Sequence, residues 1–392
     1  MKLIMMNDRF LQRAVRFFTP FLLTAVVAAG CTPPEETPSG PFTAEAASVV
    51  RPTDTPVGIT VPSASPIESE TGGYWPSDGW RTASPESQGM DSELLQEMLD
   101  DVREQKLNLY SLLIIRHGYL VSETYFGPQK DALPQDVYSV TKSFVSTLVG
   151  IAVDRGWIEG VDQKVLDFFP GESFANPDDR KVKMTVEDLL TMRTGLAWTD
   201  ADADFQAIFQ SDHWTKFMLD LPMAGLPGET FQYCSGCSHL LSAIFQKASG
   251  RSALDFAREN LFRPLGMADV EWYSDPEGVS IGGWGIRTTS RNMAKLGYLY
   301  LHGGWWDGRQ IVSTEWVDQA TKKHTATKGE LGYGYQWWTY PSWNAFMALG
   351  AYGQTIFVAP EKDLVIVTTA RLTGHEPVYR LIEEYIYPAA KD

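Results

Sequence analysis

The sharpest motif of the sequence is Ser139-Val140-Thr141-Lys142-Ser143-Phe144-Val145-Ser146-Thr147-Leu148-Val149-Gly150-Ile151-Ala152. Its apolar residues recur at the three- and four-residue spacing of one helix face: Val145, Leu148, Val149 and Ala152. Ser139 and Lys142 stand three residues apart where this helix begins, so their side chains share a face. The sequence predicts a helix with an apolar stripe that begins with a serine beside a lysine and ends near Gly156.

This serine and lysine are candidates for nucleophilic chemistry. A serine hydroxyl is a poor nucleophile until a neighbour accepts its proton, and a lysine amine accepts one only where burial or nearby positive charge lowers its pKa. Free backbone N–H groups in the first turn of a helix suit a developing oxyanion. The alternative is a capping serine with a solvated lysine, because Ser-x-x-Lys arises by chance in many proteins.

Outward from this helix, residues 81–392 form one predicted globular domain with strands near both of its ends. Residues 109–115 and 119–126 flank His117-Gly118 as a hairpin, and residues 355–358 and 364–369 form another. The long middle reads mainly as helices. We therefore predict an α+β fold, in which an antiparallel sheet built from both termini is flanked by helices and carries an inserted, mostly helical lobe.

The first 31 residues are predicted to be an export signal of the lipoprotein type. Four basic residues precede an apolar stretch at positions 17–29, which is short for a membrane-spanning helix. Small residues lead to Cys31, which is the expected lipidation site and would anchor the chain to a membrane of the bacterial cell envelope. An ordinary secretory peptide with an incidental cysteine is the alternative.

Residues 32–80 are predicted to be a flexible linker. Nine prolines lie between Cys31 and Ser77, and seven acidic residues are opposed by Arg51 alone. Such a segment has too little apolar periodicity to offset its ordering entropy.

Composition excludes several classes of protein. The 392 residues carry a formal charge of −16 and are 44% hydrophobic, which disfavours a nucleic-acid partner and excludes disorder throughout. Three cysteines cannot make a disulfide scaffold. Cys234 and Cys237 form a C-x-x-C pair without the further ligands of a zinc site, and we expect packed thiols there rather than a disulfide. The sequence indicates no metal and no cofactor.

A second motif, Phe231-Gln232-Tyr233-Cys234-Ser235-Gly236, precedes another predicted helix. Tyr233 falls in the turn before that helix, 94 residues after Ser139, so its hydroxyl is free to project into a cleft.

These motifs, in this order, resemble the serine hydrolase family of class C β-lactamases, D-alanyl-D-alanine carboxypeptidases and related esterases. The resemblance spans about residues 82–390 and includes the stretches 186–196 and 282–295. Within the family, residues 231–235 and 335–338 look most like 6-aminohexanoate-dimer hydrolases, which are amidases and esterases on short linear amides.

The resemblance implies roles for individual residues. Ser139 would be the acyl-accepting nucleophile, Lys142 its proton acceptor, and Tyr233 a second acid/base. The backbone N–H groups of Ser139 and Ala351 would form the oxyanion hole. The expected substrate-binding residues are Ser235, Gly350 and Trp338.

Two departures from the family pattern bear on the substrate. Ala348-Leu349-Gly350 stands where Lys-Thr-Gly or His-Thr-Gly is usual, and Ser235 stands where an asparagine is usual. The cation and hydroxyl that would hold a β-lactam carboxylate are therefore missing, which favours small esters or amides. A β-lactamase, a D-alanyl-D-alanine carboxypeptidase and an inactive module that binds cell-wall peptides remain the alternatives.

Gly278-Val279-Ser280-Ile281-Gly282 also fits the G-x-S-x-G nucleophile elbow, and His302-Gly303-Gly304 is similar to an oxyanion loop of α/β-hydrolases. The elbow needs a strand before its serine and a helix after it, and neither flank fits here. We expect Ser280 to be structural.

Overall fold

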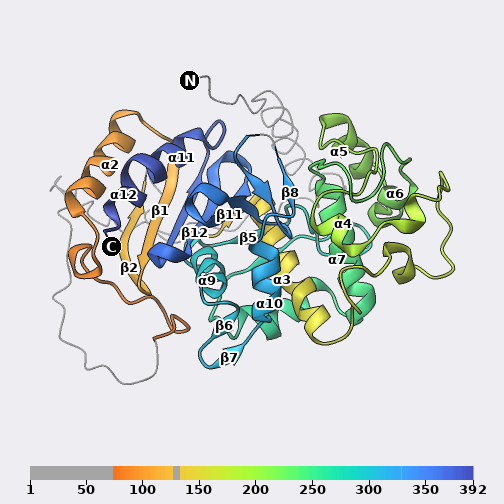
Figure 1. The fold of residues 1–392 in the computed structure, drawn as a ribbon, viewed down its shortest axis with the longest axis horizontal. Helices are drawn as coiled ribbons and strands as arrows, with labels where there is room; N and C mark the ends of the chain where they lie inside the picture. Colours follow the sequence, from red (N-terminus) through yellow and green to blue (C-terminus); the bar gives the residue numbers. More distant parts are fainter. Residues whose placement is uncertain (1–73, 127–132, 328, 392) are drawn as a thin grey trace, which may run out of the picture.

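An eight-stranded sheet forms the centre of the computed structural model, which describes residues 74–126, 133–327 and 329–391 (Figure 1). The strand order is β2-β1-β13-β12-β11-β10-β9-β8, and all neighbours pair antiparallel. The strands are β1 (Leu109–Arg116), β2 (Tyr119–Tyr125), β8 (Thr325–Ala326), β9 (Gly332–Tyr333), β10 (Trp338–Tyr340), β11 (Ala345–Gly350), β12 (Gln354–Ala359) and β13 (Leu364–Ala370).

The two ends of the domain meet in this sheet, as the sequence predicts. The β1–β2 hairpin near the N-terminal end pairs with β13 near the C-terminal end, and Ile114 lies opposite Ile366. Both predicted hairpins are confirmed, and the α+β class with them. The short strands β8, β9 and β10 extend the sheet beyond the expected hairpins.

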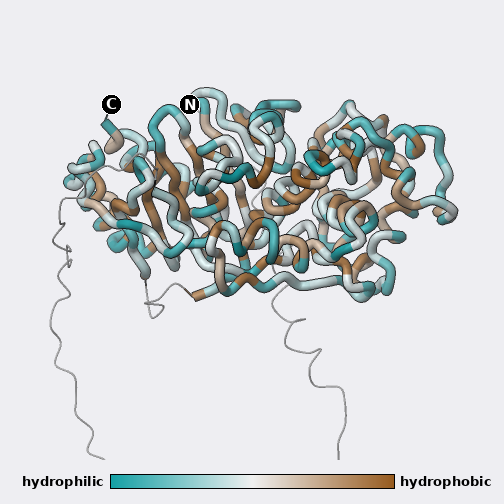
Figure 2. Tube along the Cα trace, turned by 90° about the horizontal axis from the view of Figure 1, so that it is seen from below, coloured by the Kyte–Doolittle hydropathy of each residue, from teal (hydrophilic) through white to brown (hydrophobic). Residues whose placement is uncertain are grey.

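Both faces of the sheet are covered, which explains why its central strands read as continuous apolar runs. On β1, Leu112 and Ile114 pack with the terminal helices α2 (Ser92–Glu104), α11 (Glu376–Leu381) and α12 (Tyr387–Ala389). Leu113 and Ile115 point the other way, toward α9 (Ser290–Leu301), because successive side chains of a strand alternate. In Figure 2, hydrophobic segments run mainly through the interior of the molecule, and hydrophilic segments lie toward its outside.

The inserted helical lobe lies at the far end of the molecule from the terminal helices (Figure 1). Its central helix α7 contacts α3, α4 and α6. The helices of this region are α3 (Thr141–Asp154), α4 (Val186–Leu190), α5 (Asp202–Phe209), α6 (Trp214–Asp220), α7 (Ser235–Ser249) and α8 (Ala253–Ala257). A small sheet in the order β3-β5-β4 (Gln135–Asp136, Ile286–Thr288 and Glu271–Trp272), the hairpin β6–β7 (Trp305–Trp306 and Arg309–Gln310) and α10 (Thr314–Thr321) complete the domain.

The described chain begins inside the predicted linker. Residues 74–80 pack on the domain: the rings of Trp75 and Trp80 contact Tyr298, and Ser77 accepts a hydrogen bond from Trp306. The predicted signal 1–31, with Cys31, and residues 32–73 of the predicted linker lie outside the described residues. Within the described ranges, no helix is long and apolar enough to cross a membrane.

Candidate active site

Ser139 and Lys142 are placed where the chain enters the helical lobe. Ser139 lies in the 3₁₀ turn η2 (Tyr138–Val140), and Lys142 lies in the first turn of α3, which follows at once. Lys142 Nζ lies 3.0 Å from Ser139 Oγ. Ser139 is half-buried, whereas only 1% of Lys142 is exposed, and neither η2 nor α3 has a side-chain N-cap. The alternative of a capping serine with a solvated lysine is therefore wrong.

Burial changes the acid–base behaviour of Lys142. Removal from water disfavours the charged amine and lowers its pKa to about 7, while the nearby charge of Asp200 acts in the opposite direction. The Nζ atom also donates to Ser235 Oγ at 2.9 Å and to the Gly283 carbonyl at 2.7 Å. This lysine can therefore lose its proton near neutral pH, which an exposed lysine cannot do.

Tyr233 lies in the turn before α7, as the sequence predicts, and its ring centroid is 4.8 Å from Lys142 Nζ. Burial raises the pKa of Tyr233, and a hydrogen bond with Ser139 acts in the opposite direction. The phenol therefore remains protonated at neutral pH, beside both Ser139 and Lys142, and is able to donate a proton.

Cys234 and Cys237 form a disulfide, so the expectation of packed thiols is wrong. Cys234 caps the N-terminus of α7, and Cys237 lies in its first turn. A cap residue and the residue three positions later lie close together, here with Cα atoms 5.2 Å apart, which is within the usual range for a disulfide. The bond closes the turn that carries Tyr233 and Ser235.

The end of β11 lies against the turn that carries Ser139. A Cβ atom on Gly350 would come within 2.3 Å of the Val137 carbonyl oxygen and 3.2 Å of the Ser139 nitrogen, so this close approach requires glycine. His375 Nε2 lies 2.9 Å from the Gly350 carbonyl oxygen. Because that carbonyl and the Ala351 N–H belong to one peptide unit, His375 helps to fix the peptide beside Ser139.

Ser235 and Asp200 lie behind the lysine. Ser235 is 3% exposed, and its hydroxyl donates to Asp200 Oδ2 at 2.6 Å. Asp200 Oδ1 accepts from the Ser235 N–H at 2.7 Å and from Trp198 Nε1. The predicted substrate-binding residue Ser235 thus faces the interior.

Sequence reasoning missed Asp200. It stands in the acidic stretch Asp200-Ala201-Asp202-Ala203-Asp204, which has the composition of a solvated surface segment. The one local signal is Trp198 two positions before it, whose indole N–H donates to this carboxylate.

Aromatic side chains adjoin the site on two sides. Trp338, a predicted substrate-binding residue, is half-buried and stacks on Tyr233 with ring centroids 5.8 Å apart. Next to Gly283, the ring of Trp284 contacts an aromatic group from α5 and α6, namely Phe205, Phe209 and Trp214. Trp198 and Trp337 are core residues instead, each at most 1% exposed.

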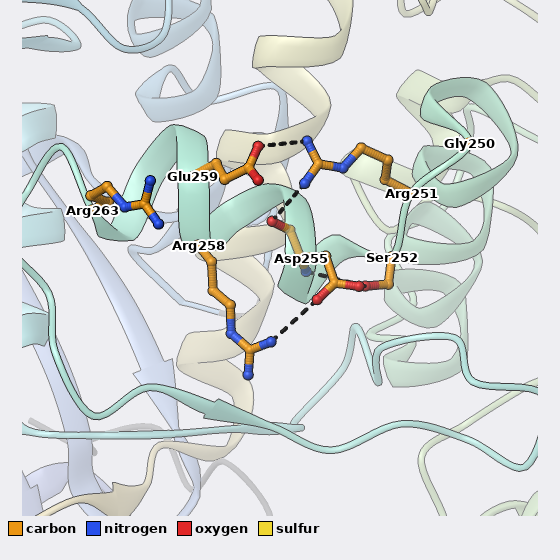
Figure 3. Close-up of a pocket in the computed structure, with 7 residues that line it drawn as sticks. All are labelled: Gly250, Arg251, Ser252, Asp255, Arg258, Glu259 and Arg263. Carbon is orange, nitrogen blue, oxygen red and sulfur yellow. Dashed lines mark hydrogen bonds and ion pairs between the residues drawn. The ribbon is translucent and has the colours of Figure 1, made fainter.

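Other candidate sites share no residue with this cluster. Ser280 is 3% exposed and accepts a hydrogen bond from the Leu254 N–H, and no helix follows it as a nucleophile elbow requires. Within the described ranges, no group of three His, Cys, Asp or Glu side chains could hold a metal ion. Figure 3 shows a pocket around α8 whose side chains pair with one another, Arg251 with Glu259 at 2.9 Å and Arg258 with Asp255 at 3.2 Å.

Known proteins share this sequence pattern and fold. The family described as Beta-lactamase matches residues 92–390. The 6-aminohexanoate-dimer hydrolase of Paenarthrobacter ureafaciens is 26% identical over 283 residues, which cover 66% of this chain and 71% of the relative.

Solved structures agree on the fold. A Beta-Lactamase/D-Alanine Carboxypeptidase from Pseudomonas syringae has a TM-score of 0.61 at 15% identity, covering 76% of this chain and 99% of that one. A family VIII carboxylesterase has a TM-score of 0.63 at 16% identity, covering 78% of this chain and 98% of that one. With a family match that extends over most of its length, this chain belongs to the beta-lactamase family of serine hydrolases.

Proposed function

We propose that this protein hydrolyses an ester or amide bond of a small substrate through an acyl-enzyme on Ser139. The observation that carries the proposal is a buried lysine amine 3.0 Å from the hydroxyl of the half-buried Ser139. With a pKa lowered to about 7, Lys142 is a base at neutral pH.

In the acylation step, Ser139 Oγ attacks the substrate carbonyl carbon while its proton passes to Lys142 Nζ. The tetrahedral intermediate then collapses, the bond from carbon to the leaving oxygen or nitrogen breaks, and the leaving group takes a proton from Tyr233. The Lys142 ammonium then returns its proton to the Tyr233 phenolate, so that both groups regain their starting protonation states. In deacylation, water attacks the carbonyl carbon of the acyl-enzyme by the same series of steps. The acid is then released and Ser139 is restored.

The oxyanion of the intermediate is proposed to accept hydrogen bonds from the backbone N–H groups of Ser139 and Ala351. The close approach of Gly350 to the Ser139 nitrogen supports this assignment. The contact of His375 with the Gly350 carbonyl adds rigidity, because it holds the far side of the same peptide.

A small, open-chain ester or amide is the proposed substrate class. One relative is named for a linear amide, the dimer of 6-aminohexanoate. Ala348-Leu349-Gly350 offers no side-chain cation or hydroxyl for a β-lactam carboxylate. Trp338 and Trp284 present apolar rings beside the site, which suits a substrate with apolar carbon chains.

We propose further that the enzyme is exported and held to a membrane by lipid on Cys31. The basic and apolar segment before Cys31 and the proline-rich stretch after it support this proposal. Expression in a bacterium fed an alkyne-tagged fatty acid should label the wild type and not Cys31→Ala. Equal labelling of both chains would contradict it.

A burst experiment tests the catalytic proposal. p-Nitrophenyl butyrate should give a burst of about one nitrophenol per chain, and a fluorophosphonate probe should label Ser139 in a tryptic peptide. Ser139→Ala should lose both signals, with activity down by several orders of magnitude. Labelling at Ser280, or an active Ser139→Ala variant, would overturn the proposal.

The same experiment separates the alternatives. A folded protein that neither reacts with the probe nor turns over any ester or amide would be an inactive binding module. Turnover of the cephalosporin nitrocefin faster than that of any linear ester or amide would identify a β-lactamase.

A further inference from the structure

The feature that extends the proposed function is the ring of acceptors around Lys142 Nζ. Three oxygen atoms surround it: Ser139 Oγ at 3.0 Å, Ser235 Oγ at 2.9 Å and the Gly283 carbonyl at 2.7 Å. They come from three separate parts of the chain, and Ser235 and Gly283 are both buried. The amine therefore has a fixed set of partners.

The number of N–H bonds on the amine limits how these partners can be used. The ammonium form has three N–H groups and can donate to all three oxygens. The neutral amine, which the proposed base must be, has two N–H groups and one lone pair. One of the three partners must then donate a hydrogen bond to that lone pair.

The Gly283 carbonyl has no proton to give, so the lone pair must face one of the two serines. Ser139 is the productive choice, because its proton is the one to be removed. Ser235 is the competing choice, since a hydroxyl can be a donor or an acceptor. What decides between them is the direction of the Ser235 proton.

Asp200 fixes the direction of the Ser235 hydroxyl proton. Its Oδ2 accepts from Ser235 Oγ at 2.6 Å, while its Oδ1 accepts from the Ser235 N–H and the Trp198 indole. Burial raises the pKa of Asp200, whereas the Lys142 charge and the three donors that face the carboxyl group act in the opposite direction and favour its ionised form. With its O–H directed at Asp200, Ser235 can only accept from Lys142, and the lone pair is left for Ser139.

We propose that Asp200, acting through the Ser235 hydroxyl, is a positioning residue that aims the lone pair of neutral Lys142 at Ser139 Oγ. This inference rests on the proposed role of Lys142 as the base. It also gives a reason for serine at position 235, because only a side chain that donates to Asp200 and accepts from Lys142 can transmit the orientation.

Asp200 has a second, opposite effect on the lysine. Two titratable side chains face Lys142 in the described site: Asp200, from the segment before α5, and Tyr233, from the turn before α7. The phenol is neutral, so Asp200 supplies the charge, which stabilises the ammonium and raises its pKa. Removal of this charge should ease deprotonation while the orientation is lost.

The test is the pH dependence of kcat/KM for p-nitrophenyl butyrate in Asp200→Asn. An asparagine amide would donate to Ser235 Oγ and turn the serine proton toward Lys142. We expect the maximal kcat/KM, reached on the plateau at high pH, to fall about 10- to 100-fold, because part of the contribution of a general base is lost. We also expect the acid limb, the rise of kcat/KM with pH as Lys142 loses its proton, to move to lower pH. A merely structural defect would not cause this shift.

Two further variants keep the test decisive if Asp200→Asn folds poorly. Ser235→Ala keeps the backbone N–H bond to Asp200 and should lower the plateau by a similar factor, and the double variant should be no worse than either single one. Asp275→Asn, which alters another buried carboxylate, should leave the acid limb in place.

Three outcomes would overturn the inference: an unchanged plateau in Ser235→Ala, losses that multiply in the double variant, or an equal shift of the limb in Asp275→Asn. They differ from failure of the proposed function itself. That failure would appear as activity in Ser139→Ala, whatever the Asp200 variants do.

Discussion

Two buried pairs of a basic and an acidic side chain are connected to helix α7, one at its first residue and one a turn later. Only one of the pairs contacts the candidate nucleophile Ser139. Lys142 reaches Asp200 through Ser235, the first residue of the helix. One turn later, His239 Nε2 lies 3.1 Å from Asp275 Oδ2, and both side chains are fully buried.

Both carboxylates are held in the same manner, by backbone N–H groups. Asp200 accepts from the Ser235 N–H, and Asp275 accepts from the N–H groups of Glu277 and Val279. Burial and anchoring of the acid therefore do not distinguish the two pairs.

What each base faces does distinguish them. Lys142 Nζ lies 3.0 Å from the hydroxyl oxygen of Ser139, a half-buried residue. His239 packs against the Trp214 ring, with centroids 5.5 Å apart, and is 0% exposed. Under the proposed function, the contact with Ser139 is what lets Lys142 act as the base, whereas the described partners of His239 are Asp275 and the Trp214 ring.

Substitution of the bases themselves should separate the pairs most strongly. Lys142→Met should lower kcat/KM for p-nitrophenyl butyrate at least 10³-fold, because Tyr233, which also contacts Ser139 in the described site, carries its own proton at neutral pH and cannot accept another. His239→Leu should stay within about threefold of the wild type. Esterase assays on both folded variants check this, and a Lys142→Met variant within tenfold of the wild type would break the contrast.

For the free energy of unfolding, we expect substitution of His239 to be costly and substitution of Lys142 to have an effect that depends on pH. His239→Leu leaves the Asp275 carboxylate buried without its partner, so the free energy of unfolding should fall by about 3 kcal/mol. Lys142→Met should gain relative to the wild type as the pH falls from 10 to 7, by about 1.4 kcal/mol per pH unit. The sign follows because the lowered pKa of Lys142 makes the wild-type fold bind fewer protons than the unfolded chain in that window.

Urea denaturation at pH 7 and pH 9 measures both effects. A wild-type stability that changes with pH in parallel with Lys142→Met would contradict the lowered lysine pKa.

The pH profile of the wild type should report Lys142 and not His239. Because the pKa of Lys142 is lowered to about 7 and the protonated amine is inactive, kcat/KM should rise about 100-fold from pH 5 to pH 8. Burial raises the pKa of Tyr233, so no decline is expected up to pH 9. The same limb should appear in His239→Leu, and its displacement in that variant would show that the pairs are coupled.

Removal of the disulfide should have the smallest effect of these changes. It should affect the site that contains Lys142 and Asp200 and not the His239–Asp275 pair. The Cys234–Cys237 bond closes a loop of only four residues, which limits its contribution to about 2 kcal/mol. The double variant Cys234→Ala/Cys237→Ala should lower stability by that amount and kcat/KM by a few-fold, since the turn carries Tyr233. Unfolding with and without a reductant checks this: the reductant should lower wild-type stability and leave the variant unchanged.

Much of the fold was accessible from local pattern. The two hairpins lie at Gly- and Pro-containing turns between apolar runs, and the helix after Ser139 follows its apolar spacing. Strands β8 to β10 are only two or three residues long, too short for a periodic signal. Cys234 and Cys237 form a disulfide because their positions at the helix cap bring them together, which their spacing alone does not reveal.

The two hairpins, the helical lobe and the motifs of Ser139, Lys142 and Tyr233 could be predicted from the sequence, because periodicity and short motifs are properties of residues close together in the chain. The tertiary structure alone decided what Lys142 is able to do. Its partners Ser235 and Gly283 lie 93 and 141 residues further along the chain. Loss of water around the amine, and the hydrogen bond that Asp200 accepts from Ser235, depend on contacts that form only when those segments meet.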